Sequence, residues 1–206
     1  RYPPQPKTAA ALAGRRVVAG SAGTDHSLAL TADGSVWSWG DGDLGKLGHG
    51  DEQIQWQPKK IEALAGRRVV AVSAGPFHSL ALTADGAVFA WGKGEHGCLG
   101  HGDDLSNQLL PKKIEAFVGQ RVVAVSTGPF HSLALTADGA LWSWGRGALG
   151  QLGHGDEQNQ PLPKKVEALA GQRVVAVSAG GSHSLALTAD GAVWSWGGGG
   201  YGRLGH

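Results

Sequence analysis

One sequence recurs along the whole chain and constrains the fold more than any other feature. The string HSLALTADG occurs four times, at intervals of 52 or 53 residues, and LGH follows each copy at a constant distance. Repeats of this length build arrays or propellers, because each unit buries its apolar face against the next. We therefore expect one repeat domain over residues 1–206. Its repeats lie at about 12–63, 64–116, 117–168 and 169–206, with residues 1–11 as a closing strand.

Each repeat has the pattern of a small antiparallel sheet. Residues 67–73 are rich in β-branched side chains, and residues 78–83 alternate polar and apolar ones. A type I′ turn at Asp85-Gly86 then leads to a return strand at 87–91, and residues 111–117 are expected to form an outer strand. The pattern predicts an all-β fold of β-propeller blades, each about 52 residues long.

The full motif, GxxHSLALTxDGxVWSWGxGxxGxLGHGD followed by P and IEAL, resembles the regulator-of-chromosome-condensation repeat family over essentially the whole chain. That resemblance implies a seven-bladed propeller. It also implies the roles found in the family: nucleotide exchange on a small GTPase, ultraviolet perception and docking in ubiquitin ligases. Four repeats are fewer than such a ring needs, so we expect a partial ring, a ring completed by further copies, or closure by four blades alone.

Several classes of function are not expected from this chain. A formal net charge of +1 gives no electrostatic reason to expect nucleic-acid binding, and no apolar run approaches the roughly 20 residues that cross a membrane. A GxGxxG string recurs in every repeat, but no helix is expected after it, so we interpret it as a turn and expect no cofactor. The repeats are too alike to provide an asymmetric catalytic site, so we expect no enzyme and no catalytic residue.

Recurring histidines and tryptophans are interpreted as structural residues. Four related histidines at the heads of successive blades would lie too far apart to bind one metal ion, so we expect hydrogen bonds to neighbouring strands. The tryptophans are expected to pack between blades. The structural positions are His26, His78, His131, His183, Trp39, Trp91, Trp144 and Trp196.

Contact with a partner is expected where the repeats differ. Trp56 has no counterpart in the other repeats, and Phe77 and Phe130 hold the same place in adjacent blades. Tyr201 belongs to a second variable loop set, which also includes residues 41–44, 93–96 and 146–149. Cys98 takes the place of Lys46, Gln151 and Arg203 in the sister repeats and is interpreted as a surface thiol.

We expect a protein-interaction scaffold that binds protein partners and is a candidate homo-oligomer. A single cysteine favours the cell interior, cytoplasm or nucleus, and a chain that begins at Arg1 and lacks methionine is expected to be a processed or excised segment. One alternative is an ultraviolet-B-responsive oligomer. However, the positions that match the photoreceptor's GWRH tryptophan are Thr24, Pro76, Pro129 and Gly181. The other alternative, an exchange regulator of a small GTPase, lacks the inserted wedge of that family member, because no repeat carries an insertion longer than one residue.

Overall fold

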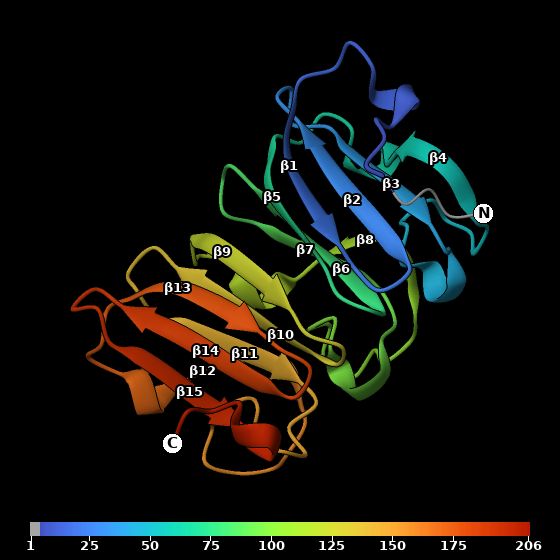
Figure 1. Ribbon diagram of the computed structural model, residues 1–206. Helices are drawn as coiled ribbons and strands as arrows, with labels where there is room; N and C mark the ends of the chain where they lie inside the picture. The colour runs from blue at the N-terminus through green and yellow to red at the C-terminus, as the bar shows by residue number, and fades with distance from the viewer. Residues whose placement is uncertain (1–4) are drawn as a thin grey trace.

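The computed structural model describes residues 5–206 as an arc of four β-sheets (Figure 1). The first blade contains β1 (Val17–Ala22), β2 (His26–Thr31), β3 (Val36–Gly40) and β4 (Gln55–Lys60). The second contains β5 (Val69–Ala74), β6 (His78–Thr83), β7 (Val88–Gly92) and β8 (Gln108–Lys113). The third contains β9 (Val122–Thr127), β10 (His131–Thr136), β11 (Leu141–Gly145) and β12 (Gln160–Lys165). The fourth contains β13 (Val174–Ala179), β14 (His183–Thr188) and β15 (Val193–Gly197). The predicted all-β, propeller-type fold is therefore confirmed, as an open arc rather than a closed ring.

Short 3-10 helices connect these strands. Those following an outer-strand position are η1 (Ala10–Leu12), η3 (Glu62–Leu64), η5 (Glu115–Phe117) and η6 (Glu167–Leu169). Those following a third strand are η2 (Asp43–Gly45), η4 (Glu95–Gly97) and η7 (Gly200–Gly202). Within residues 5–206, none of these helices is long and apolar enough to cross a membrane.

The hairpin turn differs from the predicted type I′. Gly86 has φ of 86°, but Asp85 does not adopt a positive φ, so the turn lacks the two left-handed positions that type I′ requires. Instead Gly86 N donates to Thr83 O and Thr83 N to Ala87 O, which gives a three-residue loop with a left-handed glycine. The Thr83 hydroxyl also donates to the Asp85 carboxylate, and this contact explains the Thr-Ala-Asp-Gly order in every repeat.

The outer strand begins three residues earlier than predicted and ends at Lys113, before η5. Its pairing with β7 is irregular: Ala90 lies opposite Lys112 and Gly92 opposite Gln108. Pro111 falls inside that irregularity, where its missing N–H leaves no ladder hydrogen bond unmade. The prediction placed the proline at the strand's start, but the bulge tolerates it within the strand.

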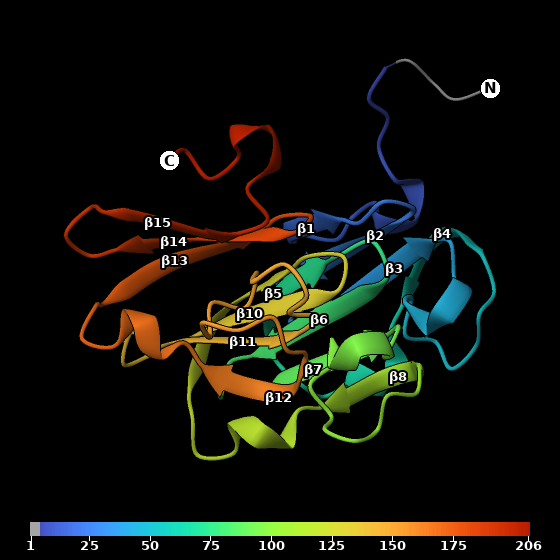
Figure 2. The same ribbon diagram turned by 90° about the horizontal axis from the view of Figure 1, so that it is seen from below.

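The last blade has three strands among the described residues, and the first blade is not paired with it. Of the predicted closing strand, residues 1–4 lie outside the described part. Gln5–Ala9 is not a strand, and Ala10–Leu12 forms η1. Figure 2 shows the first blade (blue) and the fourth blade (orange to red) on opposite sides of the arc.

The core lies between blades rather than within them. The first cluster joins Leu28, Leu30, Val36, Ile61 and Leu64 of the first blade to Val69, Ala81, Phe89 and Trp91 of the second. The other two interfaces repeat this arrangement, so three apolar clusters join four sheets. A blade is therefore stable through its neighbours, as expected of a repeat array.

Candidate functional site

Each pair of neighbouring blades is held by the same polar contact, here called the joint. In the first joint, the Ser79 hydroxyl and the Trp91 indole Nε1 both donate to the main-chain oxygen of Lys46, at 3.0 and 2.9 Å. Because the serine hydrogen is committed to that carbonyl, His26 Nε2 donates to Ser79 Oγ, at 2.8 Å. The earlier blade supplies the histidine and the carbonyl (the carbonyl side), and the later blade supplies the serine and the tryptophan (the tryptophan side).

The joint occurs three times with little variation. His78 and the Cys98 carbonyl hold Ser132 and Trp144 in the second joint. In the third joint, the corresponding groups are His131, the Gln151 carbonyl, Ser184 and Trp196. The first three histidines of the recurring string therefore contact the next blade, and Trp91, Trp144 and Trp196 do the same from the other side.

Burial fixes these histidines in the neutral form. Desolvation lowers the pKa of His26 to about 4, of His78 to about 3 and of His131 to about 4. The Nδ1 atoms of all three are buried without a hydrogen-bond partner, consistent with a ring protonated at Nε2 alone. The joint is thus an architectural element. Within residues 5–206, no group of three potential metal ligands is present either.

A different set of residues forms the candidate binding site, here called the rim. Phe77 and Phe130, from adjacent blades, stack with ring centroids 5.0 Å apart and an interplanar angle of 28°. Each follows a proline, Pro76 or Pro129, that lines a hollow of about 380 Å³ at the C-terminal ends of β1, β5, β9 and β13. Both rings are half-buried, so the pair presents an apolar edge beside a concave surface.

Three polar side chains surround this aromatic pair. The Lys93 amine lies 5.2 Å from the Phe77 centroid and 5.1 Å from that of Phe130, and the Arg146 guanidinium lies 5.8 Å from the Phe130 centroid. His96 meets Phe130 edge-on, with the centroids 5.5 Å apart. A cation over an aromatic face is attracted by the ring quadrupole, so both rings are held in place and a positive charge is kept beside them.

One acidic side chain lies next to the same group. Glu95 pairs with the Lys93 amine at 2.5 Å, and the hydrogen bond from that lysine holds the pKa of Glu95 below its usual value. Arg146 makes no ion pair within the described residues, so its charge is available to a ligand. His96 takes a left-handed conformation, with φ of 62°, that positions its ring over the rim.

The predicted contact residues therefore divide into two groups. The structure brings Phe77 and Phe130 together on the rim. Trp56 lies elsewhere, on the outer strand β4, and is 86% exposed. Tyr201 is fully exposed in η7 of the last blade.

Sequence reasoning missed Lys93 and Arg146 as members of the rim. Both had been grouped among the variable loops, and both hold the same place in adjacent blades that also carry a phenylalanine. The shared occurrence of a cation and a phenylalanine in the same two repeats could have revealed these residues. The main chain brings each pair together, because Lys93 N donates to Phe77 O and Arg146 N donates to Phe130 O.

Cys98 is not the surface thiol that was predicted. It is buried, and its Sγ donates to the Lys93 carbonyl at 2.9 Å. Burial raises the pKa of the thiol to about 12. Lys46 and Gln151 are buried at the same place, because the carbonyl of this residue is the acceptor in the joint.

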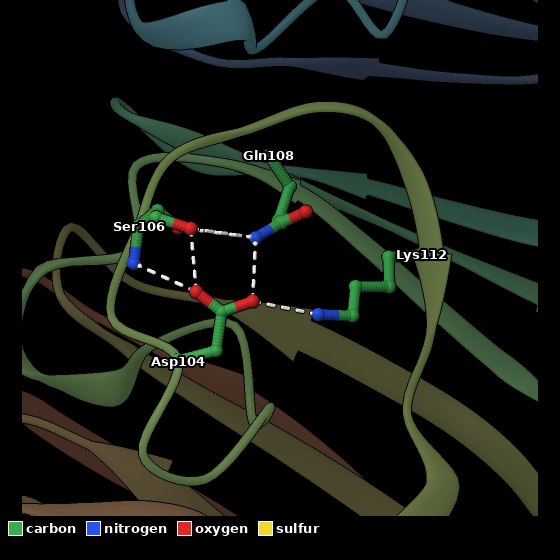
Figure 3. Close-up of polar contacts among 4 residues, drawn as sticks. All are labelled: Asp104, Ser106, Gln108 and Lys112. Atoms are coloured by element: carbon green, nitrogen blue, oxygen red, sulfur yellow. Dashed lines mark hydrogen bonds and ion pairs between the residues drawn. The ribbon is translucent and has the colours of Figure 1, made fainter.

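The loop between His101 and Pro111, which is one residue longer than the matching loops 49–58 and 154–163, forms a local polar network (Figure 3). The Asp104 carboxylate accepts hydrogen bonds from Lys112 Nζ at 2.7 Å, Gln108 Nε2 at 3.1 Å and the main chain of Ser106 at 3.2 Å. These donors, Lys112 first, hold the pKa of Asp104 well below its usual range. The network orders an exposed loop on the outer side of the second blade.

Comparison with known proteins decides the family. The model described as "RCC1-like domain" matches residues 1–206. The chain belongs to the RCC1-like family. The recognition made from the repeat motif is thereby confirmed. The chain is 46% identical over 191 residues to the human E3 ubiquitin-protein ligase HERC2, covering 92% of this chain and 4% of HERC2.

Two further RCC1-like proteins show the same relation. The ultraviolet-B receptor UVR8 of Arabidopsis thaliana is 39% identical over 204 residues, which is 98% of this chain and 46% of UVR8. A crystal structure of yeast RCC1 (Prp20) bound to Kap60 superposes with a TM-score of 0.80 at 28% identity, covering 94% of this chain and 46% of that one. The chain thus spans less than half the length of each of these three relatives.

Proposed function

We propose that this RCC1-like chain is a non-catalytic protein-interaction platform whose binding site is the rim. The observation that carries the proposal is the stacked pair of half-exposed phenylalanines, flanked by two cations at the edge of a hollow. Aromatic residues with an adjacent arginine are typical of the energetic centres of protein interfaces. The two rings already stack on each other and are held by cations, so little side-chain entropy is lost on binding.

The chemistry of the rim indicates the kind of partner. The aromatic edge suits an apolar side chain inserted beside the hollow, and the unpaired Arg146 suits a carboxylate on the same segment. Lys93 adds positive charge, although Glu95 neutralises part of it. We therefore infer that the partner presents an apolar residue with an acidic residue close to it in sequence.

Relatives support an interaction role for the fold. Yeast RCC1 was crystallised bound to the protein Kap60. The same family also includes the ultraviolet-B receptor and ubiquitin ligases, so the blades support unrelated roles and the site decides between them. Assembly of this chain with itself is a second role that we propose for the scaffold, through surfaces other than the rim.

The two alternatives lack their specific elements in this chain. The positions matching the photoreceptor's sensing tryptophan, Thr24, Pro76, Pro129 and Gly181, line the hollow, and none is a tryptophan. The tryptophans of the joints instead donate to main-chain carbonyls between blades. No repeat carries an inserted wedge for a small GTPase. We expect neither a light-induced change in mass nor faster nucleotide release from such a GTPase.

Selection of binding peptides tests the proposal. Random peptides displayed on phage are selected on the immobilised chain, and the selected peptides are synthesised and titrated by fluorescence anisotropy. We expect these peptides to combine an apolar and an acidic residue. Their affinity should fall by roughly 30-fold or more for the Phe77→Ala/Phe130→Ala variant. Leu162→Ala, which removes an exposed leucine on β12, is the matched control and should bind as the unsubstituted chain does. Equal binding by the double variant would contradict the proposal.

A further inference from the structure

A row of exposed arginines lies at the opposite end of the inner strands from the rim. β5 begins directly after Arg68 and β9 directly after Arg121, whereas Phe77 and Phe130 follow the other ends of these strands. Each strand has six residues and is about 20 Å long, so the arginines are well separated from the rim. We call this end of the blades the base.

The arginines of the base are held in place by the blade before them. A Cβ on Gly34 of the first blade would lie 3.0 Å from the Arg68 Cα and 3.4 Å from its Cγ, so the stem of this arginine lies on the neighbouring hairpin turn. Ala84 N donates to Arg68 O at 2.8 Å and fixes its main chain within its own blade. Arg121 lies on Gly86 in the same way, with its Cγ 2.9 Å from such a Cβ. Both arginines are therefore positioned by two blades and still exposed.

The positive charges of the base are not neutralised by nearby carboxylates. Among residues 5–206, Arg67, Arg68 and Arg121 make no ion pair. The Arg67 guanidinium stacks instead on the buried ring of Phe89, with its Cζ 4.7 Å from the centroid. An arginine that is fixed in this way and has no anionic partner is free to bind a carboxylate with two parallel hydrogen bonds.

Three hollows lie in a row along the base of the second and third blades, with volumes of about 260, 140 and 220 Å³. Both Arg67 and Arg68 line the largest of them. The other two also contain a cation, and an aspartate of a hairpin turn, Asp85 or Asp138, lines each of the three. The base is therefore concave and alternates in charge along its length.

Each blade also exposes one valine at the base. The pairing of β5 with β6 skips Val70, which lies in a β-bulge between Val69 and Ala71 and is 46% exposed. Val123 holds the same place in the third blade and is 45% exposed. Val175 of the fourth blade is also 45% exposed, so this exposure does not depend on how many blades flank the strand. Because a bulge re-aims a side chain, these valines are presented to a ligand rather than to the core.

We propose that the base is a second binding site, which takes an extended segment of a partner protein that combines acidic and apolar residues. Its carboxylates pair with Arg67, Arg68 and Arg121, and its apolar side chains lie against Val70 and Val123. A peptide is favoured over a nucleic acid because the aspartates that line every hollow would repel a continuous row of phosphates. The base shares no residue with the rim, so this inference and the proposed function stand independently.

The second blade differs from its neighbours in a way that supplies the key variant. Gln120 and Gln172 hold the place of Arg67 in the third and fourth blades. Arg67→Gln therefore introduces a residue that the sister blades accept at this position, and it removes one positive charge from the largest hollow.

Fluorescence anisotropy with a labelled acidic peptide tests the proposal. The probe is a short fluorescein-labelled peptide of alternating glutamate and leucine, titrated with the chain carrying Phe77→Ala/Phe130→Ala so that the rim does not contribute. We expect saturable binding that Arg67→Gln weakens by about 5-fold and Arg67→Gln/Arg121→Gln by about 25-fold. Lys164→Gln, which removes an exposed lysine from β12, is the matched control and should leave the affinity unchanged. Urea midpoints of all variants verify that each is folded.

Two further probes establish the chemistry of the ligand. The same peptide with glutamine in place of glutamate should bind about 10-fold more weakly or worse, and single-stranded oligothymidine should bind more weakly than the acidic peptide. Absence of saturable binding, or equal affinity for the double arginine variant, would overturn the proposal. Tighter binding of oligothymidine would assign the base to nucleic acid and overturn it as well. Binding that requires intact phenylalanines would support the rim and contradict the base.

Discussion

Identical strands have different environments in the second and fourth blades. β6 and β14 share the sequence HSLALT, yet every residue of β6 is buried, while His183, Leu185 and Leu187 of β14 are not. The local sequence and the hairpin register are the same in both. The difference comes from the neighbours: β6 lies between two blades, whereas β14 has one. Burial in this fold is therefore a property of the joint rather than of the blade.

The largest effect should come from truncating the same leucine on the two strands. We expect Leu82→Ala to lower the free energy of unfolding by about 2–5 kcal/mol, because it opens a cavity in a packed interface. Leu187→Ala should cost about 1 kcal/mol or less in the single chain, since that side chain is 37% exposed. Urea unfolding of the unsubstituted chain and of each variant measures both losses. Equal losses of unfolding free energy in the two variants would show that burial depends on the blade itself and not on the joint.

Acid should lower the free energy of unfolding through the buried histidines of the joints. A histidine whose pKa is lower in the folded state binds its proton in the unfolded state first. Its stabilising contribution is complete above about pH 6.5 and is lost as the pH falls toward its folded value, about 3 for His78. Between pH 7 and 5, this one group accounts for a loss of about 2 kcal/mol.

Replacing single histidines tests that assignment. His78→Gln should flatten the decline in unfolding free energy between pH 7 and 5, measured by urea titration at each pH. A His78→Gln variant that declines as steeply as the unsubstituted chain would contradict the role of burial.

The smallest effect is expected on the outer surface, far from any joint. Lys112→Ala removes an exposed donor to Asp104 (Figure 3). Exposed ion pairs contribute little to stability, so the urea midpoint should stay within error of the unsubstituted chain. A clear drop in the midpoint would mean that outer loops, and not only joints, hold the blades.

Most of the fold could be predicted from the repeat, because a strand period of two and a fixed spacing are written directly in the sequence. The turn type was wrong because a threonine hydroxyl bonding the aspartate favours a three-residue loop over the type I′ geometry. The outer strand was misplaced because a bulge at Gly92 accepts Pro111 inside the strand. Both errors concern contacts that the residue pattern alone does not specify.

The candidate site was predictable only in part. Phe77 and Phe130 stood out because two adjacent repeats share them, but their stacking depends on the angle between blades. Cys98 was placed on the surface because its sister residues, Lys46, Gln151 and Arg203, are all polar or charged. The sequence does not reveal that the carbonyl of this residue is the acceptor in the joint, which requires the residue to be buried.

Amide hydrogen exchange tests the role of the joint most directly. Peptides from β6 and β14 can be told apart by the residues before each histidine, Phe77 and Ser182. We expect β14 to exchange well before β6, because local opening is governed by the contacts that a segment buries, and β6 packs against two blades while β14 packs against one. Equal protection of the two strands would contradict the account.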